Sequence, residues 1–460
     1  MSFATSQSSR GSEVTSAARR VAGRRMRVRL AGLVIGGIIL TGLILSGAPA
    51  VTFPAGRTVT IIYTGDTRGW VEPCGCAEGV LGGLPRRATL LARLREQCPD
   101  ALIVDAGALL ASSSDPLKVP LIVERLAAMG YAAVNLGVAD YPWRHQLGGQ
   151  MTKHGLTGVS LDYAAVRGIG RQCVVKAGGP SAALPRLCSG QVRTGVRVGI
   201  TGIAALPTGK QLAALRAVLS ELRKSAELVV VLSAAGPADN LRLAREVGGM
   251  DLVIGQAPGK RPQLLRAGEV WLAAVTPEGG HVGKVTLTLG TPGIEAAHDL
   301  YALDERIPDD QPTLRAVQAY YDRVAQRLLS TSRGGTMVKA GYALASACSF
   351  CHRDIYRKWE STPHAGAIAT LQAKDRDRAP ECLQCHSEYF RRTQRAPLEK
   401  EQRAGVECAS CHGEGFVLIL RPSKKADAAK PGEKVCRGCH TPQRSPDFNF
   451  RRYKEKIRHW

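Results

Sequence analysis

Two hydrophobic patterns alternate through the middle of this chain. Short, apolar and β-branched runs are typical of strands buried on both faces, and they occur at 58–64, 101–107, 132–137, 196–204, 227–234, 251–256, 270–275 and 284–289. Between them lie stretches with apolar residues at helical spacing, such as 121–130 and 210–225. Strands that alternate with helices in this way indicate a layered α/β domain, which we expect over residues 57–300. A domain of about 240 residues is long enough to form a large core.

A single amphipathic helix is predicted after this domain, over residues 309–329. Asp310 is a suitable N-cap, and Pro312 suits the first turn. The apolar face of the helix consists of Leu314, Val317, Tyr321, Val324 and Leu328. The glycine-containing stretch 332–336 ends the helix, so we expect residues 301–341 to form a helical linker to the last segment, 342–460.

The chain begins with a basic segment that is followed by an uncharged one. Residues 1–29 are rich in Ser, Thr, Ala and Arg, and we expect them to be disordered. Residues 30–50 consist of 16 mostly apolar residues and a small-residue cleavage pattern, SGAPA. Both a cleaved signal peptide and an inner-membrane anchor fit this pattern. In either case we expect the rest of the chain to be periplasmic or otherwise extracytoplasmic.

The last quarter of the chain contains the pentapeptide Cys-x-x-Cys-His four times. Two thiols at this spacing can form thioether bonds to the vinyl groups of one haem, and the adjacent histidine then binds the iron. Paired cysteines also make structural zinc sites, but zinc does not require a histidine after every second cysteine. We therefore predict four covalently bound haem c groups, held by Cys348, Cys351 and His352; by Cys382, Cys385 and His386; by Cys408, Cys411 and His412; and by Cys436, Cys439 and His440.

Few apolar clusters surround these motifs, so the haems themselves are expected to supply the core of the segment. The sequence therefore predicts a small, mostly irregular or α-helical tetrahaem domain over residues 342–460. Haems at this density must lie close together, which favours electron conduction as their purpose.

The net charge of the chain does not alter this interpretation. A net charge of +23 would ordinarily indicate a nucleic-acid partner. Residues 342–460, however, contain 23 Lys and Arg against 14 Asp and Glu, and the propionates of four haems would offset most of that excess. We therefore expect no nucleic acid among the partners.

Residues 342–460 contain too few histidines and methionines to give each of four haem irons two axial ligands. Each motif supplies one proximal histidine, and only His364 and His459 remain in residues 342–460. The last methionine, Met337, precedes the segment. Two irons therefore lack a sixth ligand from this segment. They are open, or are bound by a neighbouring molecule, or take an upstream histidine, for which the candidates are His145, His154, His281 and His298.

The residues that flank the four motifs also resemble those of a known family. The stretches ACSFCHRDIYRKWESTPH, GVECASCHGEG and CRGCHTPQRSPDFNFRRYKEKIRH resemble the tetrahaem cytochromes that carry electrons from hydroxylamine oxidation. The resemblance implies that His364 and His459 are distal haem ligands. The family also has a histidine shortly after the third motif, where this chain reads GEGFVLILRPS, so one haem is left without its family ligand.

The motifs of residues 57–300 follow a second familiar order. A strand ends at Asp66 and is followed by GGLPRRATLL, VDAG, NLGVADY, VLSAAG and EGGHVGKVTL. This order resembles the metallophosphoesterase domain of 5′-nucleotidases, in which Asp, His and Asn at the strand ends bind two metals. Only Asp66 is kept, whereas the other ligand positions hold Arg68, Ala108, Val138, Ala139, Ala234 and Gln256. A lone carboxylate cannot hold two metals, so we expect a degenerate, inactive domain that docks a partner.

Five cysteines lie outside the four motifs. Cys74 and Cys76 follow Asp66 in the loop where the metal site would open. They could form a strained disulfide with each other, a metal clip, or a pair with Cys98, and a redox role is open to them. Cys173 and Cys188 are predicted to form an ordinary disulfide that closes a loop. Because the number is odd, one thiol is left over or forms an intermolecular bond.

These patterns together predict a tetrahaem electron carrier that exchanges electrons with redox partner proteins, and self-association is left open. Two other functions compete with this interpretation. One is a haem enzyme that acts on a small nitrogen or oxygen species at an open iron. The other is a nucleotide phosphohydrolase with accessory haems.

Overall fold

The computed structural model describes residues 57–73, 81–111, 114–177, 195–257, 263–290, 293–332, 345–373, 376–394, 405–413, 431–442 and 444–458. The predicted N-terminal segments at 1–29 and 30–50 lie outside these residues, as do Cys74, Cys76, Cys188 and His459. Within the described ranges, no helix is both long enough and apolar enough to cross a membrane.

The first of two sheets has seven strands in the order β13-β12-β1-β2-β3-β4-β5. Strand β1 pairs in parallel with β2, and the parallel ladder continues to β5, whereas β12 and β13 add an antiparallel pair at the other side of β1. The strands are β1 (Arg57–Thr64), β2 (Leu102–Asp105), β3 (Ala133–Val134), β4 (Gly158–Val159), β5 (Ile169–Gly170), β12 (His281–Leu289) and β13 (Ile294–Ala302).

The second sheet has six strands in the order β10-β11-β9-β8-β7-β6. Its central strands are parallel, and β6 and β10 are antiparallel edge strands. The strands are β6 (Gln172–Ala177), β7 (Val196–Ile203), β8 (Leu228–Ser233), β9 (Leu252–Gly255), β10 (Leu264–Ala267) and β11 (Val270–Ala274).

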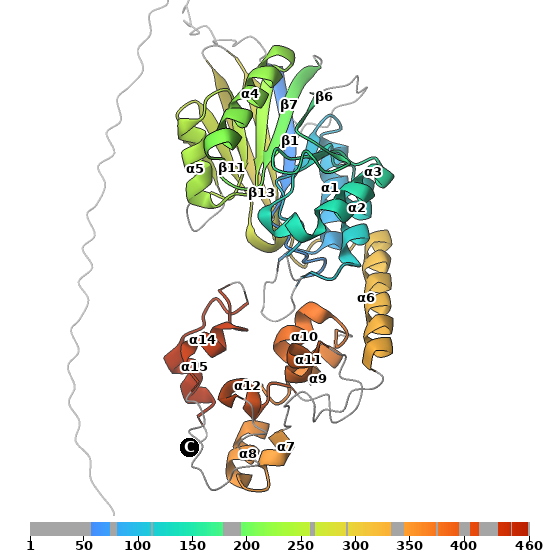
Figure 1. The fold of residues 1–460 in the computed structure, drawn as a ribbon, viewed down its shortest axis with the longest axis vertical. Helices are drawn as coiled ribbons and strands as arrows, with labels where there is room; N and C mark the ends of the chain where they lie inside the picture. The colour runs from blue at the N-terminus through green and yellow to red at the C-terminus, as the bar shows by residue number, and fades with distance from the viewer. Residues whose placement is uncertain are drawn as a thin grey trace, which may run out of the picture. The chain divides into compact units, whose positions relative to one another are not determined.

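The two sheets pack face to face, and helices cover their outer faces (Figure 1). Side chains alternate along β1, so that Ile61 and Tyr63 point into the core between the sheets, while Ile62 packs against the helices on the other side. On β8, Val230 lies between the sheets and Val229 lies under helices. Burial on both faces explains why the strands are fully apolar, and the predicted layered α/β fold is confirmed.

The helices that pack on the two sheets divide into two groups. Helices α1 (Leu84–Gln97), α2 (Lys118–Ala128) and α3 (Arg144–His154) cover the first sheet, and α4 (Gly209–Ser225) and α5 (Pro237–Glu246) cover the second. Two short 3-10 helices, η1 (Val138–Trp143) and η2 (Pro277–Gly279), lie at strand ends. We call residues 57–302 the sandwich.

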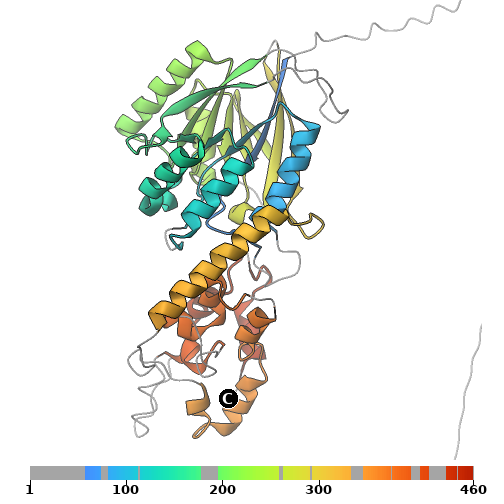
Figure 2. The same cartoon turned by 90° about the vertical axis from the view of Figure 1, so that its right-hand side faces the viewer.

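Helix α6 (Gln311–Ser332) is the predicted linker helix (Figure 2). Asp310 caps it as expected, because its carboxylate accepts a hydrogen bond from the backbone N–H of Thr313 at 2.9 Å. Val317, Tyr320 and Val324 are fully buried and pack in the same hydrophobic cluster as α1 and α2. The buried face is therefore centred on Tyr320 rather than on Tyr321, which is only partly buried.

The described residues between 345 and 458, which we call the CxxCH region, form short helices and no strand. These are α7 (Ala345–Cys348), α8 (Arg353–Glu360), α9 (Ala367–Gln372), α10 (Pro380–His386), α11 (Glu388–Thr393), α12 (Cys408–His412), α14 (Glu433–Arg437) and α15 (Phe450–Lys456). Ile368, Leu371, Leu383 and Phe390 belong to the cluster that also holds α6 and the first sheet. The helical character predicted for this region is thus confirmed, and its apolar core is continuous with that of the sandwich.

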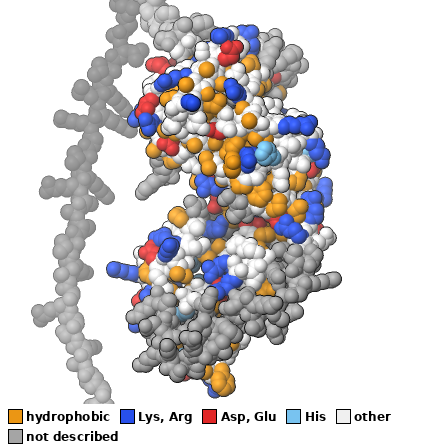
Figure 3. Space-filling view, viewed as in Figure 1, with side chains coloured by type: hydrophobic (Ala, Val, Ile, Leu, Met, Phe, Trp, Pro, Cys, Tyr) orange, Lys and Arg blue, Asp and Glu red, His pale blue; other side chains and the backbone are white. Residues whose placement is uncertain are grey.

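Lys and Arg side chains form several separate groups on the face shown in Figure 3, with Asp and Glu side chains among them. Several of these charges are paired within helices, as in Arg242 with Glu246 at 2.9 Å and Arg437 with Glu433. Pairs of this kind on exposed helices contribute little to stability, about 0.3–0.5 kcal/mol each.

Candidate functional site

Tertiary contacts bring the four Cys-x-x-Cys-His motifs together in pairs. The thiol of Cys348, in the first motif, lies against that of Cys408, in the third. The thiol of Cys385, in the second motif, lies against that of Cys439, in the fourth. Helices α7 and α12 carry the first pair, and α10 and the turn after α14 carry the second. Nothing in the local sequence indicates which motifs are partners.

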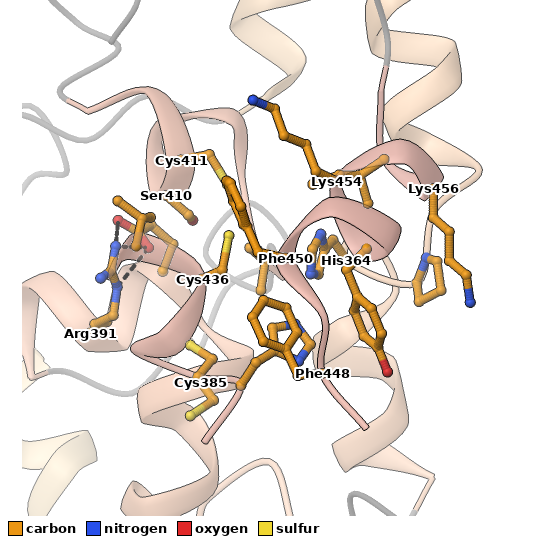
Figure 4. A pocket seen from close by; sticks show the side chains of 18 of the residues that line it. His364, Cys385, Arg391, Ser410, Cys411, Cys436, Phe448, Phe450, Lys454 and Lys456 are labelled. Carbon is orange, nitrogen blue, oxygen red and sulfur yellow. Dashed lines mark hydrogen bonds and ion pairs between the residues drawn. The ribbon is translucent and has the colours of Figure 1, made fainter. Parts of the chain in front are cut away.

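A cavity of about 330 Å³ lies at the fourth motif (Figure 4). Cys436, Cys439 and His440 line it, together with the aromatic side chains of Phe448, Phe450 and Tyr453. Cys385 and Cys411, from the second and third motifs, reach the same cavity. Lys454 and Lys456 stand at its side in Figure 4, and Arg391 lies near Cys411 and Ser410. An apolar cavity with cysteines on its wall and cations at its rim suits a porphyrin with propionates.

Two histidines face this cavity from different elements. The rings of His364 and His440 have centres 6.2 Å apart and planes inclined by 58°. A metal–imidazole nitrogen bond is about 2 Å long, so two imidazoles on opposite sides of one iron have ring centres roughly 6 Å apart. Burial lowers the pKa of both His364 and His440, which keeps the rings neutral, the form that binds metals. The ring separation would therefore allow His364 and His440 to hold one haem together.

Two of the motif histidines, His386 and His440, have a hydrogen-bond partner at one ring nitrogen. His386 Nδ1 donates a hydrogen bond to the carbonyl oxygen of Ala367 at 2.7 Å, so its Nε2 keeps the lone pair that a metal needs. His440 Nδ1 similarly lies 2.8 Å from Ser445 Oγ. The ring of His440 also stacks on Phe448, with centres 4.8 Å apart. This is the outer support that metal-binding histidines usually have, and the residues present fit haem c.

Two further cavities lie at the other motifs. A cavity of about 930 Å³ is lined by Cys382, Cys385 and His386 of the second motif and by Arg376, Glu381 and Arg444. We call it the second-motif cavity, and Pro73 of the sandwich is part of its wall. A smaller one, of about 40 Å³, is lined by Cys408, Cys411 and His412 of the third motif and by Trp359. His352 of the first motif is exposed at the start of α8.

The upstream histidines occupy positions in the sandwich. His298 Nε2 lies 2.7 Å from the hydroxyl of Tyr63, and His281 Nδ1 lies 3.2 Å from Thr276 Oγ1. His145 is exposed on α3, and His154 is half-buried at the end of that helix. None of these four lines a cavity at the motifs that we describe above. His459, the other predicted distal ligand, lies outside the described residues.

The structure corrects one predicted disulfide. Cys173 is a free cysteine on β6, where it pairs with Ile200 of β7 and packs against the core between the sheets, so the predicted bond to Cys188 is wrong. Burial raises the pKa of the Cys173 thiol to about 11, so it is unreactive at neutral pH. Cys98 is buried and disulfide-bonded, to a cysteine outside the described residues. Cys74 and Cys76 lie outside them too.

The positions at which the family resemblance places metal ligands lie together at the carboxyl ends of strands from both sheets. A Cβ placed on Gly137 would lie 3.0 Å from Ala234 Cβ and 3.1 Å from Ala108 N, so these positions share one site although their side chains carry no ligand atoms. Asp66 and Ala108 adopt left-handed backbone conformations there, with φ of 54° and 57°. The strained turns of the site persist without its ligands.

The one carboxylate that remains is bound by internal donors. Arg68 Nε lies 2.6 Å from Asp66 Oδ1, and Gln256 Nε2 donates to Asp66 Oδ2 at 2.9 Å. Burial raises the pKa of Asp66, while the Arg68 guanidinium and Gln256 act to lower it. Among the described residues, no group of three His, Cys, Asp or Glu side chains could hold a metal ion. The guanidinium of Arg68 therefore contacts Asp66, the carboxylate that the family resemblance identifies as a metal ligand.

Two buried acids beside this site were missed by sequence reasoning. Asp105, at the end of β2, is fully buried and accepts hydrogen bonds from Thr64 Oγ1 at 2.5 Å and Gly107 N at 2.9 Å. Asp140 accepts backbone hydrogen bonds from Leu109, Leu110 and Gly137, and burial raises its pKa to about 7. Asp105 ends a strand and Asp140 follows one, which is the only local signal for them in the sequence. Their carboxylates accept hydrogen bonds from loop backbone groups and so hold these loops in place.

Comparisons with known proteins agree with these two parts. Residues 347–413, which include the first three motifs, match the family model Cytochrome c554 and c-prime. None of the curated proteins matches the chain. A 5′-nucleotidase precursor from Thermus thermophilus is similar in structure, with 20% identity and a TM-score of 0.49 over 59% of this chain and 60% of that chain.

Two other solved structures resemble the sandwich. The sulfate thiohydrolase SoxB of Thermus thermophilus has 15% identity and a TM-score of 0.46 over 59% of this chain and 61% of that one. The calcineurin-like phosphoesterase YfkN of Bacillus subtilis has 15% identity and a TM-score of 0.42 over 58% of this chain and 98% of that one. This chain thus spans about 60% of the first two proteins. It combines a cytochrome c-type region with a 5′-nucleotidase-like fold.

Proposed function

We propose that this chain is a tetrahaem c-type electron-transfer protein whose phosphoesterase-like sandwich is catalytically inactive. The observation that carries the proposal is the pairwise approach of the motifs, first to third and second to fourth. Haems bonded to neighbouring cysteines of different motifs would have their porphyrin edges close together. Closely spaced haems pass electrons between them, and the protein holds and orients them.

The residues would act as follows. Cys348 and Cys351, and the corresponding cysteines of the other motifs, would hold each haem through thioether bonds. His352, His386, His412 and His440 would be proximal ligands, and His364 would be the distal ligand of the fourth haem. Haem c supplies the one-electron chemistry when it is bound. The chain's own contribution is to orient the imidazoles through Ala367 and Ser445 and to exclude water with Phe448 and its neighbours.

The location and partners form part of the same proposal. Haem c attachment takes place outside the cytoplasm, and the N-terminal segment at 30–50 would export the chain or anchor it in the inner membrane. Redox partner proteins would supply and take up the electrons, nucleic acid would have no role, and self-association could supply ligands that the chain lacks.

Reduction and haem counting test this function. We expect the purified, exported protein to contain four haems per chain by pyridine haemochrome assay and intact mass, and to take up four electrons in a titration with dithionite. The four motifs of the sequence set both numbers. Fewer than four thioether-bound haems, or haems that fail to reduce and reoxidise, would contradict the proposal.

Carbon monoxide separates conduction from chemistry at an open iron. The second-motif cavity is the largest of the three and carries polar side chains, which favours a haem enzyme as the second candidate function. Titration of the reduced protein in the Soret band would report one or two ligand-accessible irons if that candidate is right. No binding would mean that every iron has a sixth ligand and acts in electron transfer alone.

Hydrolysis by the sandwich is expected to be absent. Asp66 is already bound to Arg68 and Gln256, so Mn²⁺ should neither raise the thermal midpoint nor support cleavage of a nucleotide. Release of phosphate from AMP and differential scanning calorimetry measure the two effects. Metal-dependent turnover that disappears in Asp66→Ala would instead establish a phosphohydrolase.

A further inference from the structure

Arg444 connects the sandwich with the second motif. Its guanidinium carbon lies 4.3 Å above the ring of Trp70, and its Nη2 lies 3.8 Å from Glu278 Oε1. Its Nη1 lies 3.8 Å from Cys385 Sγ, the second cysteine of the second motif. Trp70 follows β1 and Glu278 belongs to η2, so both anchors come from loops at the degenerate metal site.

Other ion pairs hold the same boundary. Lys118 Nζ at the start of α2 lies 3.3 Å from Glu381 Oε1, and Arg376 pairs with Glu72. Tyr321 of α6 donates a hydrogen bond to Glu381 at 2.6 Å. Because these side chains are largely buried, each pair is desolvated and positioned rather than mobile. A loop of the sandwich thus contributes Pro73 to the wall of the second-motif cavity.

Arg444 contacts the second motif with its cationic guanidinium and is itself contacted by the carboxylate of Glu278. The cationic guanidinium lies against the sulfur that would be bonded to the second haem, and the carboxylate of Glu278 lies on the far side of Arg444. Reduction of a haem adds one electron, so a fixed cation nearby favours the reduced form, and a carboxylate opposes it. The effect is large where the groups are shielded from water, and Arg444 is only 19% exposed.

We propose that Arg444, positioned by Trp70 and Glu278, raises the reduction potential of the haem at the second motif. The degenerate phosphoesterase fold then has a role in this chain, which is to position a cation at an electron-transfer site. This inference rests on the proposed function, because it requires a haem at Cys382 and Cys385.

Potentiometric titration of the full chain tests this role. Arg444→Gln removes this cation and keeps the Glu278 carboxylate, and we expect one of the four midpoint potentials to fall by about 59 mV, a tenfold change for a one-electron couple. Glu278→Gln should shift the same potential upward. Trp70→Leu should lower it by less than Arg444→Gln does, and Arg444→Lys, which keeps the charge, should retain most of the parent value.

Controls identify the haem and separate the two proposals. Cys382→Ala leaves one vinyl group unreacted, which marks the absorption band of the second haem, so the shift can be followed in that background. Arg451→Gln, an exposed change of equal charge on α15, should move no potential. If all four haems titrate in both proteins but no single potential shifts, or Arg444→Gln and Glu278→Gln shift it the same way, the role of Arg444 is refuted and electron transfer stands. If the parent lacks reducible haems, the proposed function itself fails.

Discussion

Replacing Arg87 by methionine is expected to lower the free energy of unfolding by about 3–5 kcal/mol, the usual cost of removing one partner from a buried ion pair. Arg87, on α1, is only 1% exposed although it carries a charge. Its Nη2 donates to Thr67 Oγ1 at 2.9 Å, and its Nη1 lies 4.0 Å from Asp105 Oδ2. The substitution would leave the Asp105 carboxylate buried without its cation.

The same substitution has a pH signature. Burial raises the pKa of Asp105, and the Arg87 guanidinium acts to lower it. The pKa of Asp105 is raised even with Arg87 in place, so without Arg87 the folded chain would hold the Asp105 proton to a still higher pH. Because the folded state then binds more protons, stability should fall as the pH rises from about 3.8, the ordinary value for aspartate, through the folded-state pKa.

Denaturant unfolding followed by far-ultraviolet circular dichroism measures both effects. The double variant Arg87→Met/Asp105→Asn removes both charges and should recover much of the lost stability. Arg93→Met, an exposed change on the same helix, should stay within about 0.5 kcal/mol of the parent. An Arg87→Met protein as stable as the Arg93→Met protein would show that the buried pair is not needed.

Removal of His364 is expected to open one iron. In His364→Ala, the reduced protein should bind one more carbon monoxide per chain than the parent does, and its Soret band should show one more high-spin haem. The reason is that His364 lies opposite His440 with ring centres 6.2 Å apart, and no other histidine among the described residues comes from outside the motifs to line that cavity.

The haem count distinguishes a lost ligand from a lost fold. Thioether bonds keep haem attached when an axial ligand is removed, so the pyridine haemochrome value should stay at that of the parent. His364→Met should restore a six-coordinate, low-spin iron, and His145→Ala, at an exposed position on α3, should leave carbon monoxide binding unchanged. Unchanged binding in His364→Ala would show that another group is the sixth ligand of that haem.

The loops of the sandwich contact the chain's own haem-binding segment. Arg68 and Gln256 bind the Asp66 carboxylate, while residues of nearby loops, Trp70, Glu72 and Glu278, contact the CxxCH region. The sequence predicts that the sandwich docks a partner, and a partner that used this surface would have to share it with the chain's own helices. The intramolecular contact is the use of the surface that the structure supports.

Several features of this protein can be predicted from the sequence alone. Haem attachment requires cysteines three residues apart with a histidine adjacent, which is a local, covalent requirement, so the four motifs and their proximal histidines can be read directly. Strands buried on both faces need apolar residues at every position, so the layered α/β fold also follows from the pattern. The helix at 309–329 and its cap at Asp310 depend on local backbone hydrogen bonds for the same reason.

Only the tertiary structure decided which distant groups meet. The pairing of Cys348 with Cys408 and of Cys385 with Cys439, the place of His364 opposite His440, and the contact of Arg444 with Trp70 all join residues far apart in the chain. The same is true of Cys173, which packing places in the core as a free thiol rather than in the predicted disulfide. Contacts of this kind depend on how whole elements pack, and no local spacing encodes them.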